Sequence, residues 1–367
     1  MIVMKVTLKK IYGFDDFSLD FSYPKKIVNS LIGEEHLYGR ERFRYRKAVI
    51  LMGANATGKT CLGRALKNIF DYIEDSNPAH LYEMASGEGA AFTLDFVNGD
   101  YRLQRLSAGI DCRNKKVSLR YFSSSIDVMD SYEKCVSRLK EKTIDSIRLQ
   151  KTAGAFSARF SYPEIEDSVS FRNIDRTVLK KTLSAVIGTL DPTLSDITEA
   201  SELKDSFIIR RDGREIIIQD GKLLNGDMLS SGTREGVDIA FFLASIISHE
   251  GSFYYCDEHF SYIHSDIEKR VFSLMVCALG RDNQLIFTTH NTDMLDLNLP
   301  KHTYVFLRKR TQDGRICTDA VSASSILKRN TDSVRSAVEN DVFHSLPQDS
   351  LLDELEMEYL SCDEARF

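Results

Sequence analysis

The sequence lacks the paired cysteines and long apolar runs that mark several protein classes. Its seven cysteines stand singly, at positions 61, 112, 135, 256, 277, 317 and 362, with no CxxC pair. This spacing gives no sign of a zinc ribbon or a disulfide framework and fits a reducing compartment. The longest apolar run, at 239–247, is too short to cross a bilayer, and the amino terminus has no targeting signal. We therefore expect a cytoplasmic protein without a membrane partner.

No charge of one sign dominates the composition, and no internal repeat is visible. The chain has 367 residues, of which 43% are hydrophobic. That is enough for a sizeable core in one large domain or two closely joined domains. The formal net charge of −6 argues against a uniformly basic surface that coats DNA, although it leaves room for a local basic patch.

Apolar periodicity predicts an alternation of strands and helices. Alternating segments at 3–8 and 17–21 predict a hairpin, and a second hairpin is expected at 91–96 and 101–106. A continuous apolar run at 48–52 predicts a buried parallel strand. Helical spacing follows it at 59–72. Further strands are expected at 207–210, 215–219, 253–256, 284–288 and 303–308, and further helices at 233–248 and 265–279.

A complete GxxxxGK[ST] pattern, GANATGKT, runs from Gly53 to Thr60 between an expected strand and an expected helix. Glycines in such a turn let backbone N–H groups and the helix N-terminus point at phosphate oxygens. Lys59 would neutralise the β and γ phosphates, and the Thr60 hydroxyl would bind Mg²⁺. An ordinary glycine-containing turn is the alternative, and the complete motif in this context disfavours it. The residues expected to bind the nucleotide here are Gly53, Asn55, Ala56, Thr57, Gly58, Lys59, Thr60 and Cys61.

Two carboxylates, Asp257 and Glu258, directly follow the apolar strand expected at 253–256. The carboxyl end of a parallel strand lies beside a phosphate loop, where Asp257 can hold Mg²⁺ through water. Glu258 would orient or deprotonate the attacking water. An isolated acidic pair is often just a solvated strand end, so this prediction depends on the phosphate loop upstream.

Two further short segments are candidates to contact a bound phosphate. The sequence Leu229-Ser230-Ser231-Gly232-Thr233 precedes an apolar helix, where a serine and backbone amides can bind an anion. By itself it is equally typical of a helix N-cap. His290 follows the strand expected at 284–288, where an imidazole can contact a γ-phosphate and the attacking water, or can merely be a polar strand end.

In their order along the sequence, the phosphate loop, LSSGT, the acidic pair and the histidine resemble the corresponding segments of ABC ATPases. LSSGT is similar to the signature LSGGQ, and more closely to the variant of OLD-like and related AAA-type ATPases of bacterial defence systems. The resemblance implies an α/β P-loop NTPase of ABC-head type, of the SMC/RecF/OLD-like class, with a mixed core sheet, an antiparallel β subdomain and a helical insertion. It implies binding of ATP and Mg²⁺ and hydrolysis with Lys59, Glu258 and His290 as catalytic residues. Ser230, Ser231 and Gly232 would then contact the nucleotide held by a second copy.

The resemblance also suggests a division of the chain into four parts. Residues 1–108 would form an amino-terminal ATPase lobe with the phosphate loop, and 206–325 a carboxyl-terminal lobe with the signature, the acidic pair and the histidine. Between them, 109–205 reads as a helical insertion with helices at 131–150 and 177–190, without the sustained heptads of a coiled-coil arm. Residues 326–367 form a helical, acidic tail.

Some family features are not matched. No glutamine is clearly placed for the Q-loop, for which Gln104 and Gln150 are candidates, and no basic residue lies between Ile11 and Phe14 to contact adenine. The segment His264-Ser265-Asp266 resembles the D-loop but has serine in place of proline. Nothing after residue 310 resembles a TOPRIM nuclease, so nuclease activity is not expected.

Two biological tasks fit an ABC head of this kind. The first is control of a separate effector protein, a toxin or nuclease, in anti-phage defence or a toxin-type system. The second is a RecF-like DNA repair ATPase that clamps nucleic acid with the basic segments 40–47 and 113–120, although such charge runs are often only solvated surface. A transporter subunit is disfavoured, because the phosphate loop lies too far in sequence from Leu229.

Overall fold

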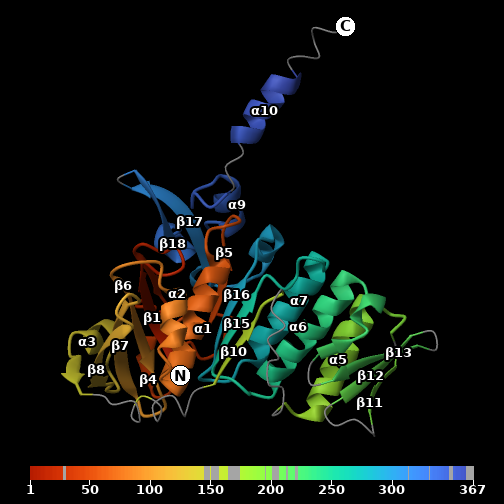
Figure 1. Cartoon of the computed structure of the whole chain (residues 1–367), viewed down its shortest axis with the longest axis horizontal. Helices are drawn as coiled ribbons and strands as arrows, with labels where there is room; N and C mark the ends of the chain where they lie inside the picture. The colour runs from red at the N-terminus through yellow and green to blue at the C-terminus, as the bar shows by residue number, and fades with distance from the viewer. Residues whose placement is uncertain are drawn as a thin grey trace.

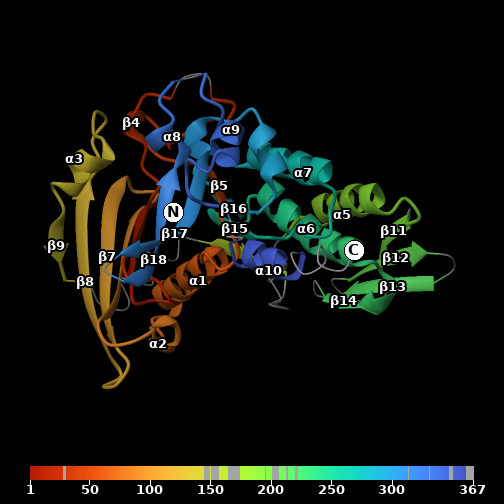
Figure 2. The same ribbon diagram turned by 90° about the horizontal axis from the view of Figure 1, so that it is seen from above.

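The computed structural model describes residues 1–27, 30–143, 149, 157–163, 174–194, 196–200, 206–211, 214–219, 222–312, 314–329, 331–346 and 350–360. Helices and strands of the chain gather around a central sheet, with an antiparallel sheet at one end of the molecule and a smaller one at the other (Figures 1 and 2). Among the described residues, no helix is long and apolar enough to cross a membrane.

The central sheet consists of mostly parallel strands brought together from distant parts of the sequence. Its order is β10-β15-β16-β5-β17-β18, and only β17 and β18 pair antiparallel. The strands at its centre are buried on both faces, as expected of parallel strands covered by helices. The bounds are β10 Ala158–Ser161, β15 Phe253–Asp257, β16 Gln284–Thr288, β5 Ala48–Met52, β17 Tyr304–Gln312 and β18 Arg315–Ser322.

Side chains of this sheet alternate between two apolar cores. Val49 and Leu51 of β5 pack in one core with α1 (Lys59–Asp75) and the amino-terminal strands. Ile50 and Met52 pack in the other core with α5 (Arg176–Leu190), α6 (Ser231–Ile247) and α7 (Ser265–Ala278). The central sheet is therefore the middle layer of three, and its strand ends have fixed positions relative to both flanking layers.

The antiparallel sheet forms the amino-terminal β subdomain that the resemblance implied. Its order is β2-β1-β6-β7-β8-β9, and both hairpins predicted from the sequence are present. The bounds are β1 Ile2–Lys9, β2 Phe17–Asp20, β6 Ala90–Val97, β7 Arg102–Asp111, β8 Lys116–Ser125 and β9 Lys140–Lys142, with β3 His36–Leu37, β4 Arg40–Arg44 and α2 Ala79–Met84 nearby.

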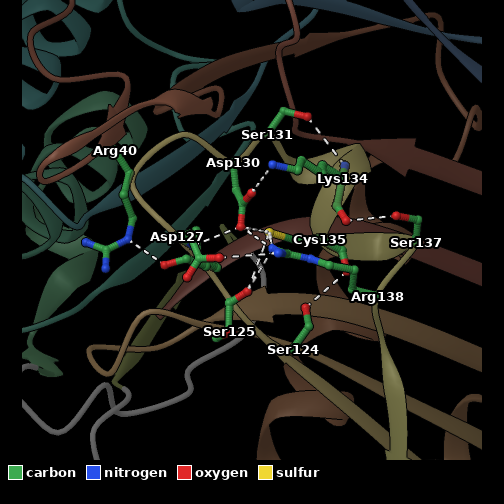
Figure 3. A network of polar contacts seen from close by, with 11 residues as sticks. Arg40, Ser124, Ser125, Asp127, Asp130, Ser131, Lys134, Cys135, Ser137 and Arg138 are labelled. Carbon is green, nitrogen blue, oxygen red and sulfur yellow. Dashed lines mark hydrogen bonds and ion pairs between the residues drawn. The ribbon is translucent and has the colours of Figure 1, made fainter.

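A polar network closes the outer edge of this subdomain (Figure 3). The fully buried carboxylate of Asp130 forms ion pairs with Lys134 and Arg138 around the short helix α3 (Tyr132–Val136). Arg138 also pairs with Asp127. Because an unpaired buried carboxylate is costly, removing either cation would destabilise this corner; we assign the network a structural role.

The prediction of a helical insertion over 109–205 is wrong in its first part. β8 extends the antiparallel sheet, and the described part of the helix expected at 131–150 contains α3, then β9, with Leu149 again helical; 144–148 and 150 lie outside the described residues. β10 enters the central sheet beside β15. Pairing with neighbouring strands decided these conformations, which single-segment periodicity does not report. The second expected helix is confirmed as α5.

A small sheet packs under α5 at the other end of the molecule. Its order is β11-β12-β13-β14, and the core strand β12 places Phe207 and Ile209 against α5 and α6. The bounds are β11 Asp196–Glu199, β12 Ser206–Arg211, β13 Arg214–Gln219 and β14 Lys222–Leu224, followed by the 3-10 turn Gly226–Met228. This sheet and α5 support the amino-terminal end of α6.

The segment after β18 packs on the apolar core as far as Phe343. Two short helices, α8 (Ala323–Ile326) and α9 (Val334–Glu339), pack near β17 and the 3-10 turns Thr292–Asp296 and Lys301–Thr303. The helix α10 (Ser350–Leu360) projects away from the body (Figure 1). Acidic side chains alternate with leucines along it, as the sequence predicted for the tail.

Candidate active site

The strands β5, β16 and β15 lie side by side in parallel, so the segments that follow them meet at one edge of the central sheet. Leu51 is paired with Thr288, and Thr288 with Asp257. The phosphate loop after β5, the acidic pair at the end of β15 and His290 after β16 are thereby brought together. The sequence placed each segment at a strand end, and the sheet order makes them neighbours.

The phosphate loop curls tightly before α1. Thr57 closes the turn, since its hydroxyl donates to the Ala54 carbonyl at 2.8 Å. Gly58 has φ 100°, and a Cβ there would lie 2.8 Å from the Phe14 ring. Glycine is required at this position both by the backbone conformation and by the close aromatic neighbour. The α1 N-terminus consequently faces the loop interior, the arrangement that binds phosphate.

Lys59 lies at the centre of the site, with its side chain only 4% exposed. Its ammonium donates to the carbonyl oxygens of Gly53 at 2.6 Å and Ala54 at 3.2 Å, and it lies 3.1 Å from Glu258 Oε1. The Lys59 carbonyl accepts from the buried Tyr255 hydroxyl at 2.6 Å. The lysine is thus anchored from both sides and its charge is directed into the loop.

Asp257 forms the polar centre beneath the loop. Its two carboxylate oxygens accept hydrogen bonds from the hydroxyls of Thr60, at 2.6 Å, and Thr288, at 2.7 Å. Burial raises the pKa of Asp257 above its ordinary value, while the two hydroxyls and Lys59 act in the opposite direction. The carboxylate is buried, hydrogen-bonded and aligned with a threonine hydroxyl.

The Thr60 and Asp257 pair fits a Mg²⁺ ion chemically. Both supply hard oxygen ligands, and protein sites for Mg²⁺ with nucleotides use one or two such ligands and leave the rest to phosphate and water. The described residues contain no cluster of three or more His, Cys, Asp or Glu side chains that would form a metal cage. The donor set is that of a nucleotide-linked Mg²⁺ rather than a protein-enclosed metal.

Glu258 occupies a left-handed backbone conformation, with φ 46°. Its N–H donates to both the Thr288 carbonyl and the Thr288 hydroxyl, at 3.2 and 3.1 Å. These bonds hold the carboxylate over the loop, where His290 Nδ1 lies 4.0 Å from its Oε1. Non-glycine residues in this conformation cluster at functional sites.

The LSSGT segment begins α6 and lies apart from the phosphate loop. Ser230 is the N-cap, and its hydroxyl accepts from the Thr233 N–H at 3.2 Å. Ser230 and Ser231 are exposed. A Cβ at Gly232 would lie 2.7 Å from the Tyr262 carbonyl. Among the described residues, no hydrogen bond or ion pair joins this segment to Gly53–Thr60 of the same chain.

Several contributors were not identifiable from the sequence. Thr288, Tyr255 and Phe14 support the loop and the acidic pair, and each reads in sequence as an ordinary strand or turn residue. Ser161, at the carboxyl end of β10, contacts the buried His259 at 2.6 Å beside Glu258. Such contacts join residues far apart in the chain, so no local pattern marks them.

Of the two Q-loop candidates, the one that the structure describes does not reach this site. Gln104 is buried in the antiparallel sheet and accepts from the Tyr121 hydroxyl at 2.7 Å, and Gln150 lies outside the described residues. The segment His264-Ser265-Asp266 starts α7, where His264 caps the helix by accepting from the Asp266 N–H.

The basic segments make contacts mainly within the chain itself. Arg40 lies over the Tyr101 ring, and the Lys47 ammonium is buried and donates to the Gly33 carbonyl. Arg113 and Arg120 form ion pairs with neighbouring glutamates. Arg40 and Lys47 are thus held by contacts within the chain, whereas the Arg113 and Arg120 side chains are more than half exposed.

Solved structures similar to this chain are head domains of SMC proteins. An SMC head bound to the C-winged helix domain of ScpA is 13% identical, over 89% of this chain and 100% of that chain, with a TM-score of 0.54. An Smc head from Pyrococcus furiosus, bound to the C-terminal domain of ScpA, is 12% identical over 88% and 97%, with a TM-score of 0.52. One from Pyrococcus yayanosii is 10% identical over 89% and 98%, with a TM-score of 0.51.

No family model and no curated protein matches the sequence. Identities this low show a shared fold alone. The similarity covers 88–89% of this chain. The protein therefore has the α/β P-loop fold of an ABC-type ATPase head, as the sequence resemblance predicted.

Proposed function

We propose that the protein binds ATP with Mg²⁺ between two copies of itself and hydrolyses it. The observation that carries this proposal is the convergence of Lys59, the Thr60 and Asp257 pair and Glu258 on the N-terminus of α1. These groups supply a cation for phosphate, oxygen ligands for a divalent metal and a base for water.

Each residue has a distinct task in the proposed reaction. The loop N–H groups and Lys59 bind the β and γ phosphates, which requires Lys59 to exchange its contact with Glu258 for phosphate oxygens. Thr60 and Asp257 would hold Mg²⁺, which would neutralise developing charge on the phosphates. Released from Lys59, the Glu258 carboxylate accepts a proton from the attacking water. His290, whose Nδ1 lies 4.0 Å from Glu258 Oε1, would donate to the γ-phosphate.

The second copy is required because the signature residues are exposed and make no contact with their own phosphate loop. Ser230 and Ser231 carry hydroxyls at the start of α6, where the helix dipole favours an anion. Paired head to tail, each α6 N-terminus would meet the γ-phosphate held by the other copy. In this arrangement bound ATP holds the two copies together, and hydrolysis releases them.

The biological task that we propose is control of a separate effector protein, a toxin or nuclease, by ATP-driven closure in a defence or toxin-type system. Its support is the resemblance of two segments, LSSGT at 229–233 and TTHN at 288–291, to OLD-like ATPases. The alternative is a RecF-like clamp on DNA, for which the exposed Arg113 and Arg120 are available, while Arg40 and Lys47 make contacts within the chain. DNA binding that strengthens with ATP and weakens with salt would favour that alternative.

The proposal is tested with Glu258→Gln. This variant should bind ATP with parental affinity but hydrolyse it at least about 100-fold more slowly, since a general base contributes rates of that order. A dimer should then accumulate with ATP and Mg²⁺ and be visible by light scattering. Glu88→Gln, at an exposed turn, is the matched control and should behave as the parent.

Ser230→Arg separates binding from pairing. The added bulk and charge should block ATP-dependent dimerisation while calorimetric ATP binding to the monomer persists. Hydrolysis by Glu258→Gln at the parental rate would remove Glu258 from the mechanism. Dimerisation of Ser230→Arg with ATP would refute the contact between copies.

A further inference from the structure

Glu268, on α7, is a buried carboxylate that the proposed reaction does not use directly. Its side chain is 1% exposed. Oε1 accepts from the Thr289 hydroxyl at 2.8 Å, and Oε2 accepts from the Asn291 side-chain amide at 2.6 Å. The two partners are the residues immediately before and after His290.

Burying the Glu268 carboxylate would be energetically costly without these two hydrogen bonds. Burial raises the pKa of its carboxyl group, and the hydrogen bonds from Asn291 and Thr289 are the main opposing effects. The described residues place no lysine or arginine in ion-pair contact with it. A buried carboxylate satisfied by only two neutral donors is unusual, and both donors belong to one loop.

The loop is also fixed by its own backbone. The Thr289 N–H donates to the Leu51 carbonyl of β5 at 3.2 Å, and the Asn291 N–H donates to the Thr289 hydroxyl at 3.0 Å. His290 itself is 58% exposed, and within the part of the chain that the structure describes its nearest charged partner is Glu258 Oε1, at 4.0 Å. Its location over the site therefore depends on how its two neighbours are held.

We propose that Glu268 is a positioning residue that holds His290 at the γ-phosphate site by clamping Thr289 and Asn291. The proposal rests on the proposed function for the role of His290, while the clamp itself rests on the contacts above. Glu268 touches neither substrate nor reacting atoms. It acts by restricting the loop, which reduces the entropy lost when His290 engages phosphate.

Exchanging the hydrogen-bond donor and acceptor between positions 268 and 291, at unchanged net charge, distinguishes positioning of His290 from a general contribution to stability. Glu268→Gln keeps the size and can still accept from Thr289, but it sets an amide donor against the Asn291 amide. Asn291→Asp sets two carboxylates against each other. In the double variant Glu268→Gln/Asn291→Asp, the amide at position 268 can donate to the carboxylate at position 291. The hydrogen bond is thereby restored with donor and acceptor exchanged.

The experiment measures kcat, ATP affinity and dimerisation for the four proteins of this cycle, with Glu74→Gln on the exposed face of α1 as a control. Each single variant should lose about tenfold in kcat, the effect of disrupting a hydrogen bond to a charged group, with ATP affinity unchanged within about twofold because the phosphate loop is intact. The double variant should recover most of kcat. Single variants with parental kcat, or a double variant no better than the singles, would overturn the clamp.

A second readout does not depend on hydrolysis. The His290 imidazole signals, assigned by NMR with a His290→Gln reference, should shift or broaden in each single variant and return in the double variant. If the parent hydrolyses no ATP, the proposed function fails, and these signals still test the clamp. If the parent hydrolyses ATP and the signals are identical in all four proteins, the clamp fails and the function stands.

Discussion

Replacing Glu235 with glutamine should remove a defined part of the pH dependence of stability. Glu235 lies in the second turn of α6, is 7% exposed, and accepts the Tyr262 N–H at 3.2 Å through Oε2. Burial raises its pKa from the ordinary 4.5 to about 7; the hydrogen bonds from Tyr262 and Ser261 lower it, and the nearby Asp238 and Glu268 carboxylates add to the rise.

The sign and the size follow from proton linkage. Folded protein binds this proton more tightly than unfolded protein, so the stabilising contribution is complete below pH 4.5 and is lost as the pH rises through about 7. At roughly 1.4 kcal/mol for each pKa unit, the loss between pH 5 and pH 8 amounts to about 2.5 kcal/mol. Glutamine is neutral throughout and can still accept from Tyr262.

The assay is urea unfolding followed by circular dichroism at pH 5 and pH 8. The free energy of unfolding of Glu235→Gln should decrease between these values by about 2.5 kcal/mol less than that of the parent. Glu354→Gln, on the exposed helix α10, should keep the parental dependence. If the free energy of unfolding changed equally with pH for Glu235→Gln and the parent, the pKa of Glu235 would not be raised in the folded protein.

Three further substitutions test the packing of helix glycines and the surroundings of the acidic pair. Gly63→Ala in α1 should lower the unfolding free energy by about 1–3 kcal/mol despite the better helix propensity of alanine, because its Cβ would lie 2.6 Å from the Tyr255 ring; Gly188→Ala in α5, where the Cβ meets nothing within 4 Å, should be neutral or stabilising by up to about 1 kcal/mol. Equal effects in thermal denaturation would contradict the close contact. Thr288→Val should reduce ATP hydrolysis about tenfold at low Mg²⁺, because Asp257 loses one of its two hydroxyl donors, and added Mg²⁺ should restore part of the rate. A parental Mg²⁺ titration would remove Thr288 from the metal site.

The sequence determined the local parts of this protein. Apolar runs and their spacing predicted the central strands and the helices α1, α5, α6 and α7, because burial on a sheet or helix face leaves a period in the sequence. The phosphate loop was evident for the same kind of reason. Glycine, lysine and threonine at fixed offsets are required by a turn whose backbone must bind phosphate, and all the residues of that turn are neighbours in the chain.

Only the tertiary structure decided which distant residues meet. β8 and β10 became strands because existing sheets offered them partners, although the sequence of 109–205 favours helices. Thr288 reaches Asp257 across 31 positions, and Glu268 reaches Thr289 across 21. The physical reason is that a buried polar side chain is stabilised by whichever donor the fold brings within hydrogen-bond distance, and that distance depends on strand order and helix packing rather than on spacing along the chain.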